Sequence, residues 1–161
     1  MEQVCVGVDI GGTSVKLGIF TLNGDLLKKW EIPTEPKNDP KALIEKIGKS
    51  IKETLKEARL TLTDCVGVGM GVPGPVMPNG FIEVVVNIGW REVFPARILS
   101  DLLAGMPVAL GNDANVAALG EAWMGGAKHQ QDSVMVTLGT GVGGGIIIDG
   151  KIVPGKHGLG G

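Results

Sequence analysis

The chain has 161 residues, 43% of them apolar and 20% charged, with a formal net charge of −2. That length is ample for one hydrophobic core and marginal for two, and the slight negative charge argues against a nucleic-acid-binding face. No apolar run approaches the roughly 20 residues of a membrane span, and Met1 leads directly into a strand without a signal peptide. We therefore expect a cytoplasmic protein that binds neither nucleic acid nor membrane. Cys5 and Cys65 are expected to be free thiols in buried strands.

Residues 4–20 predict two strands joined by a tight glycine turn. Asp9 ends the first strand, residues 11–13 (Gly-Gly-Thr) form the turn, and Lys16 lies in the second strand. The strands are too close in sequence for a helix between them, which excludes both the dinucleotide fingerprint and the Walker loop. Because glycine lets backbone N–H groups approach an anion, the turn is predicted to hold phosphate, with Asp9 binding a divalent cation or its water. An ordinary hairpin is the alternative.

The next stretch predicts a strand over residues 26–32, ended by Pro33 and Thr34, and then an amphipathic helix. Asp39 and Pro40 are typical of a helix N-cap and of the first helical position. Apolar residues recur at helical spacing after them, with lysines and glutamates between, so one stripe of the helix should pack on the sheet. Thr34, taken by itself, is a loop residue.

A buried strand over residues 66–70 leads into residues 71–75, whose sequence Gly-Val-Pro-Gly-Pro predicts a rigid, sharply turned loop. The loop starts with Gly71 at the carboxyl end of a strand, where open α/β sheets place ligands. Extended chain over residues 81–86 then reaches Asn87 in an Asn-Ile-Gly-Trp segment. Taken alone, the first segment is better explained as an ordinary turn, and the second is compatible with a turn beside a buried indole.

Asp113 lies between a strand over residues 108–110 and an Ala-rich helix over residues 114–124, after a short helix over residues 95–104. An Asp in this place commonly caps the helix. A carboxylate at the end of a central strand can instead accept the proton of an attacking hydroxyl. The residue alone leaves both functions open, and the phosphate turn and the Gly-Pro loop nearby favour the second.

Residues 134–148 repeat the first glycine hairpin, and in the alignment of the two copies Thr137 falls on Asp9. Both copies then reach a polar turn of the kind that tight hairpins favour. Such a repeat predicts two similar lobes that each offer one loop to the same polyphosphate. We expect the first lobe to span residues 1–127 and the opening of the second to span residues 128–161.

Three features carry a family resemblance: the hairpin D-I-G-G-T-x-x-K, the hairpin L-G-T-G-x-G-G-G and the Asn-Asp pair just before the Ala-rich helix. Together they resemble the ROK family (repressors, open reading frames and kinases), above all its bacterial-type glucokinases. The resemblance covers essentially all 161 residues. It implies an α/β fold of the ribonuclease-H-like, actin-like ATPase kind, in which a mixed sheet is flanked by helices. The chain would hold the first lobe and the start of the second.

The resemblance implies transfer of the γ-phosphoryl group of ATP to a hexose, with the 6-hydroxyl of glucose as the expected acceptor. Asp113 would be the general base, and Asp9 would bind Mg²⁺ through phosphate or water. The expected substrate-binding residues are Gly71, Asn87, Asn112, Asp113 and His157, and the expected ATP-binding residues are Gly11, Gly12, Thr13, Lys16, Gly139, Thr140 and Gly141.

The resemblance leaves other activities open. A ROK-type repressor would carry a helix-turn-helix ahead of the first hairpin, which a strand beginning at Val4 argues against. A non-catalytic sugar sensor would lack the base, so Asp113 argues against it, whereas kinases for N-acetylmannosamine, fructose or mannose share these loops. In the family a Cys-rich zinc motif and the adenine pocket follow the counterpart of Gly161. A structural zinc is therefore expected only in that missing part, a homo-oligomer only for the full-length form, and the isolated chain is expected to be inactive.

Overall fold

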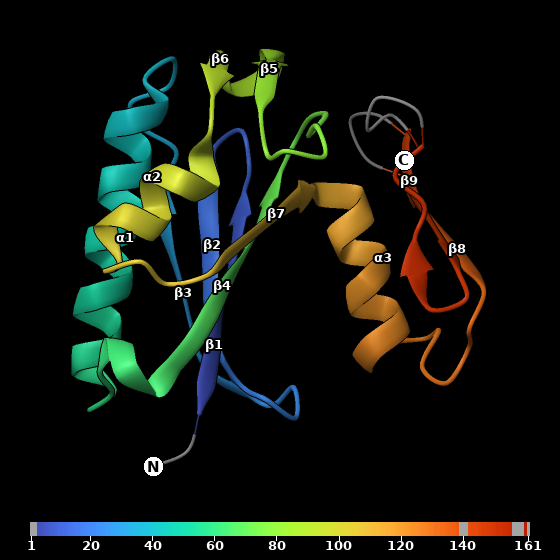
Figure 1. Cartoon of the computed structure of the whole chain (residues 1–161), viewed down its shortest axis with the longest axis horizontal. Coiled ribbons are helices and arrows are strands. Elements are labelled where there is room, and N and C mark those ends of the chain that lie inside the picture. The colour runs from blue at the N-terminus through green and yellow to red at the C-terminus, as the bar shows by residue number, and fades with distance from the viewer. Residues whose placement is uncertain (1–2, 139–141, 156–159, 161) are drawn as a thin grey trace.

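The computed structural model describes residues 3–138, 142–155 and 160 of the chain. The strands and α-helices are β1 (Val4–Ile10), β2 (Ser14–Thr21), β3 (Leu26–Pro33), α1 (Pro40–Glu57), β4 (Cys65–Val72), β5 (Ile82–Val85), β6 (Trp90–Val93), α2 (Pro95–Leu102), β7 (Val108–Asn112), α3 (Asp113–Met124), β8 (Ser133–Leu138), β9 (Val142–Ile148) and β10 (Lys151–Ile152). Two short 3-10 helices, Leu62–Asp64 and Val86–Ile88, lie between them. Three strands come first and α1 follows them; three more strands lead to α2, β7 lies between α2 and α3, and the β8–β9 hairpin with β10 comes last (Figure 1).

A five-stranded sheet in the order β3-β2-β1-β4-β7 forms the centre of the fold. Strands β1, β2 and β3 make an antiparallel meander, whereas β1, β4 and β7 run parallel to one another. The predicted mixed sheet flanked by helices is therefore confirmed. Helices α1 and α2 lie on one side of the sheet, and α3 follows β7 directly and lies beside the β8–β9 hairpin (Figure 1).

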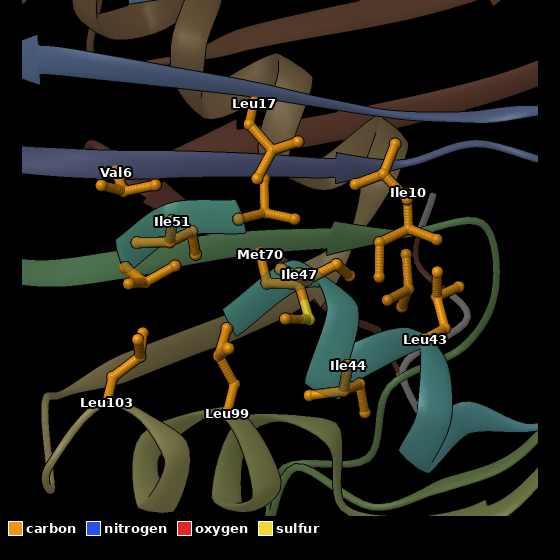
Figure 2. Packing of buried hydrophobic residues seen from close by; sticks show 14 of the residues in the cluster. Val6, Ile10, Leu17, Leu43, Ile44, Ile47, Ile51, Met70, Leu99 and Leu103 are labelled. Atoms are coloured by element: carbon orange, nitrogen blue, oxygen red, sulfur yellow. The ribbon is translucent and has the colours of Figure 1, made fainter. Parts of the chain in front are cut away.

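Helix α1 packs on the central sheet through a single apolar stripe. Leu43, Ile47 and Ile51 recur at helical spacing and are fully buried. Figure 2 shows these side chains in one cluster with those of β1 and β4, among them Ile10 and Met70. Each such leucine or isoleucine contributes about 1.5–3 kcal/mol when it leaves water, so this layer holds the sheet and helix together.

The start of α1 follows the prediction from the sequence. Pro40 is the first helical residue, and a side-chain oxygen of Asp39 accepts a hydrogen bond from the backbone N–H of Ala42 at 3.0 Å. This bond satisfies one of the N–H groups that the first turn of a helix leaves free.

Among the described helices none is both long enough and apolar enough to cross a bilayer.

Helix α3 approaches the β8–β9 hairpin very closely, because β9 has glycines where the two meet. A Cβ atom placed on Gly145 would collide with the Cβ of Ala118 and would lie 3.0 Å from the carbonyl oxygen of Ala114. A Cβ on Gly143 would lie 3.4 Å from the Cβ of Ala114. The glycines of β9 therefore allow the helix backbone to pack directly on the strand.

Both cysteines are free, as predicted. Cys65 is buried in β4, whereas Cys5 is only partly buried although its strand β1 lies in the core. Burial raises the pKa of both thiols above the ordinary value. A raised pKa keeps the thiol protonated, and a protonated thiol is a poor nucleophile.

Candidate active site

An open cleft of about 700 Å³ lies where the parallel strands β1, β4 and β7 end. Asp9 of β1 pairs in register with Gly71 of β4, and Gly71 pairs with Gly111 of β7, so these strand ends meet at one edge of the sheet. Five of the predicted site residues line the cleft. They are Asp9, Gly71, Asn87, Asn112 and Asp113.

Asp113 is the first residue of α3, and its Oδ1 accepts a hydrogen bond of 2.8 Å from the backbone N–H of Ala114. The N-cap is Asn112, whose Oδ1 accepts a hydrogen bond of 3.2 Å from the backbone N–H of Asn115. The alternative that Asp113 is the cap of this helix is therefore wrong. Asp113 lines the cleft at the positive end of the helix dipole, which favours a negative charge there.

Asn112 links the Gly-Pro loop to α3. Its Nδ2 donates a hydrogen bond of 3.3 Å to the carbonyl oxygen of Gly74, while its Oδ1 caps the helix. On the same side, a Cβ atom on Gly71 would lie 3.6 Å from the Cα of Asp113. The absence of a side chain at Gly71 thus leaves open the space directly beside Asp113.

Asp9 lies opposite Lys16 in the register of β1 and β2. Removal from water raises the pKa of the Asp9 carboxyl, the positive charge of Lys16 lowers it, and the negative charge of Asp113 raises it. The net result is a pKa above the ordinary value of 3.8. The two carboxylates therefore interact across the cleft, and a cation bound near them would relieve their repulsion.

The donor set fits Mg²⁺ held mainly by phosphate and water. Asp9 and Asp113 supply hard carboxylate oxygens, and the described ranges contain no cluster of three or more His, Cys, Asp or Glu side chains that could form a full metal cage. Mg²⁺ commonly takes one or two protein carboxylates and completes its shell with substrate phosphates and water.

The predicted phosphate turn lies beside the cleft and not in its lining. Gly11, Gly12, Thr13 and Lys16 are absent from the described residues that line it. The two glycines differ, because a Cβ on Gly11 would lie 2.8 Å from the carbonyl oxygen of Ser14, whereas a Cβ on Gly12 would meet no other atom within 4 Å. Gly11 is therefore required by the turn itself, and Gly12 leaves open space above it.

The β8–β9 hairpin contributes residues that the sequence analysis did not include in the site. Thr137 and Gly143 line the cleft, and the two residues are paired in the register of β8 and β9. The repeat alignment contained the signal for Thr137, because it set this residue on Asp9. The predicted site residues Gly139, Thr140, Gly141 and His157 lie outside the described residues.

A larger hollow of about 900 Å³ lies along β7, between α2, α3 and the loop around Pro78. It shares Asn112 and Val116 with the cleft. Of the predicted site residues that the structure describes, Asn112 alone lines it. The smaller cleft is the better candidate, because two carboxylates and two asparagine amides converge there.

The ROK family model matches residues 5–161. The chain belongs to the ROK family. Among curated ROK relatives, the glucokinase of Halalkalibacterium halodurans is 41% identical over 157 residues, which are 97% of this chain and 47% of that protein. The xylose repressor of Caldicellulosiruptor bescii is 29% identical and is covered over 39% of its length.

Solved structures of ROK proteins share this fold. The crystal structure of a ROK family glucokinase from Streptomyces griseus in complex with glucose and AMPPNP superposes with a TM-score of 0.82 at 32% identity, over 97% of this chain and 48% of that one. The ROK hexokinase from Thermus thermophilus gives a TM-score of 0.85 at 35% identity, over 99% of this chain and 51% of the other. This ROK chain thus spans about half the length of the curated relatives it matches.

Proposed function

We propose that the protein containing this chain transfers the γ-phosphoryl group of ATP to a hydroxyl of a hexose, with glucose as the first substrate to test. The observation that carries the proposal is the convergence of Asp113, Asp9, Asn87 and Asn112 on one cleft at the ends of parallel strands. The similarity to glucokinases, one of them crystallised with glucose and AMPPNP, supports the same conclusion.

In this mechanism Asp113 accepts the proton of the attacking sugar hydroxyl. As the proton leaves, the sugar oxygen bonds to the γ-phosphorus and the bond from that phosphorus to the bridging oxygen breaks, which yields a sugar phosphate and ADP. Phosphoryl transfer depends mostly on positioning and on neutralising charge. The place of Asp113 at the start of a capped helix suits this role, because the helix fixes its backbone beside the open space at Gly71.

The phosphates would be held from two sides. The turn with Gly11, Gly12, Thr13 and Lys16 would bind one side through backbone N–H groups and a positive charge, and the β8–β9 hairpin would face it with Gly139, Thr140 and Gly141. Mg²⁺, bound near Asp9 directly or through water, would neutralise the charge on the β- and γ-phosphates.

The sugar would lie next to Asp113, against Gly71 and within reach of the amides of Asn87 and Asn112. The Nδ2 of Asn112 uses one N–H for Gly74, so its second N–H is the group that would serve a sugar hydroxyl. His157 is retained as a proposed sugar contact.

We further propose that the protein acts in the cytoplasm as a homo-oligomer, with lobes divided at about residue 127.

A sugar-responsive repressor is the second candidate, because ROK repressors are also among the relatives. The kinase is favoured by Asp113, since a sensor needs sugar contacts but no base. N-acetylmannosamine, fructose and mannose are the competing acceptors for a kinase.

A coupled ADP-release assay tests the proposal on the natural gene product that contains this chain, hereafter the whole protein. Each hexose is supplied with MgATP, and ATP without sugar is the control. We expect ADP release that depends on sugar and is fastest with glucose. Sugar binding by calorimetry without any sugar-dependent ADP release would overturn the kinase and favour the sensor.

A further inference from the structure

Thr34, which follows β3, is fully buried directly beneath the predicted phosphate turn of residues 11–13, here called the nucleotide-side turn. Its Oγ1 donates a hydrogen bond of 2.8 Å to the carbonyl oxygen of Gly11. Its backbone N–H donates a second bond of 3.0 Å to the carbonyl oxygen of Thr13. One residue that is distant in sequence thus holds two of the three carbonyl groups in the turn.

These two bonds also fix the direction of the N–H groups in the turn. A trans peptide unit is planar, and its C=O and N–H point in opposite directions. Holding the carbonyl of Gly11 toward Thr34 therefore points the N–H of Gly12 away from Thr34, and holding the carbonyl of Thr13 does the same for the N–H of Ser14. A Cβ placed on Gly12 would meet no other atom within 4 Å, so there is room for a ligand beside this part of the turn.

We propose that Thr34 is a positioning residue for nucleotide binding, acting through Gly11 and Thr13. The inference rests on the proposed function, because it assumes that the turn holds the phosphates of ATP. Thr34 contacts no ligand itself. Its hydroxyl sets the orientation of backbone donors before the nucleotide arrives, and such preorganisation strengthens binding by lowering its ordering cost.

The same segment continues toward the sugar side of the cleft. Residues 34–38, here called the strap, end at Asn38, whose backbone N–H donates a hydrogen bond of 3.0 Å to the carbonyl oxygen of Ile88. Ile88 directly follows Asn87, which lines the cleft. The strap therefore joins the nucleotide-side turn to the segment that carries Asn87, with Thr34 as its anchor at the nucleotide end.

The test is Thr34→Val in the whole protein, with Thr34→Ser as the conservative variant. Valine keeps the branched shape but removes the donor to the Gly11 carbonyl, so we expect MgATP to bind roughly tenfold more weakly, the scale of one lost hydrogen bond. The KM for ATP should rise by a similar factor while kcat and the glucose dissociation constant change little. Serine keeps the hydroxyl and should restore most of the nucleotide affinity.

Two further variants separate positioning from a general loss of stability. Thr21→Val changes another buried threonine whose hydroxyl bonds within a turn, at the opposite end of β2, to Asp25. It should leave the ATP dissociation constant unchanged even if it lowers the melting temperature. Gly12→Val is the positive control, because its side chain would block the open space over the turn and should weaken MgATP binding more than glucose binding.

The outcomes distinguish the inference from the function on which it rests. If the wild-type protein does not bind MgATP, the proposed function fails. If the wild-type protein binds MgATP and Thr34→Val binds it equally well, Thr34 has no positioning role. Equal losses in Thr34→Val and Thr34→Ser, or losses of ATP and glucose affinity together, would likewise overturn the inference, since they indicate a packing defect and not the missing hydroxyl.

Discussion

At the residue scale, the cleft brings together two carboxylates that differ in their surroundings. Asp113 lies at the start of α3, where the helix dipole favours its negative charge. Asp9 lies at the end of a central strand, and partial removal from water together with the charge of Asp113 raises the pKa of Asp9 despite the opposing charge of Lys16. Asp9 therefore lowers the stability of the ligand-free fold when it is ionised, and a bound cation would reverse that effect.

Asp9→Asn tests this description through the pH dependence of stability. A carboxyl group with a raised pKa in the folded state favours folding only while it is protonated, so its destabilising effect is absent below the ordinary pKa of 3.8 and is complete above the folded pKa. We expect the variant to have a higher urea midpoint than the wild type at neutral pH, with a gain that shrinks as the pH falls toward 3.8. A lower midpoint at neutral pH would contradict this assignment.

At the element scale, the direct packing of α3 on β9 links Asp113 to the second hairpin. Ala114 and Ala118 on the helix lie against Gly143 and Gly145 on the strand. The helix that carries Asp113 therefore has a fixed position relative to β8 and β9, between which the second predicted phosphate loop lies. The glycine run of β9 thus has a packing role, next to the loop residues for which the repeat predicted a ligand role.

Gly145→Ala should disturb this contact. The added methyl group would collide with Ala118 and crowd the carbonyl of Ala114, and overpacking of this kind typically costs about 1–3 kcal/mol. We expect a lower melting temperature and, because α3 carries Asp113, a lower kcat in the whole protein. Gly120→Ala on the same helix is the matched control, since its Cβ would meet nothing within 4 Å. It should stabilise the helix slightly, and similar behaviour of the two variants would argue against close packing at Gly145.

The elements that the sequence predicted well are those whose signals are local. The meander and the start of α1 follow from strand periodicity and from the Asp39-Pro40 pair, and the structure has both. Capping was one of the two functions that the sequence left open for Asp113, but the N-cap of α3 is the preceding residue, Asn112. The sequence could not separate the two residues, because Asn and Asp are almost equally good caps and are adjacent here. The burial of Thr34 could not be predicted, because its bonds to residues 11 and 13 require the folded turn.

At the scale of the whole molecule, the β8–β9 hairpin exposes a large apolar surface. Val136, Leu138 and Val142 are 61%, 83% and 78% exposed, respectively, and Val134 and Ile148 are also exposed. Contiguous apolar surface of this kind on a strand pair favours association with another chain. In the central sheet, by contrast, the apolar side chains on one face are buried beneath α1 and α2 (Figure 1).

The 161-residue chain on its own should therefore associate in a concentration-dependent manner, and it should show no glucose-dependent ATP consumption. Sedimentation velocity over a range of concentrations measures the association, and Val136→Lys with Leu138→Lys should reduce it by placing charges on the exposed face. A chain that stays monomeric throughout would contradict the first expectation. Robust turnover by the chain alone would show that it contains all the residues needed for phosphoryl transfer, against our division of the site between two lobes.

The most direct test of the central claim, that the cleft at Asp113 is a phosphoryl-transfer site, is the turnover of Asp113→Asn in the whole protein with glucose and ATP binding measured alongside. Because Asn112 caps α3 and the asparagine side-chain oxygen can still accept from the N–H of Ala114, the variant should fold, with its stability lowered by no more than about 1 kcal/mol through the lost charge at the helix N-terminus. We predict that it binds both ligands and turns over roughly 10²-fold or more slowly, the scale of general-base catalysis. Near-normal turnover in the folded variant would contradict the account and remove Asp113 from the mechanism.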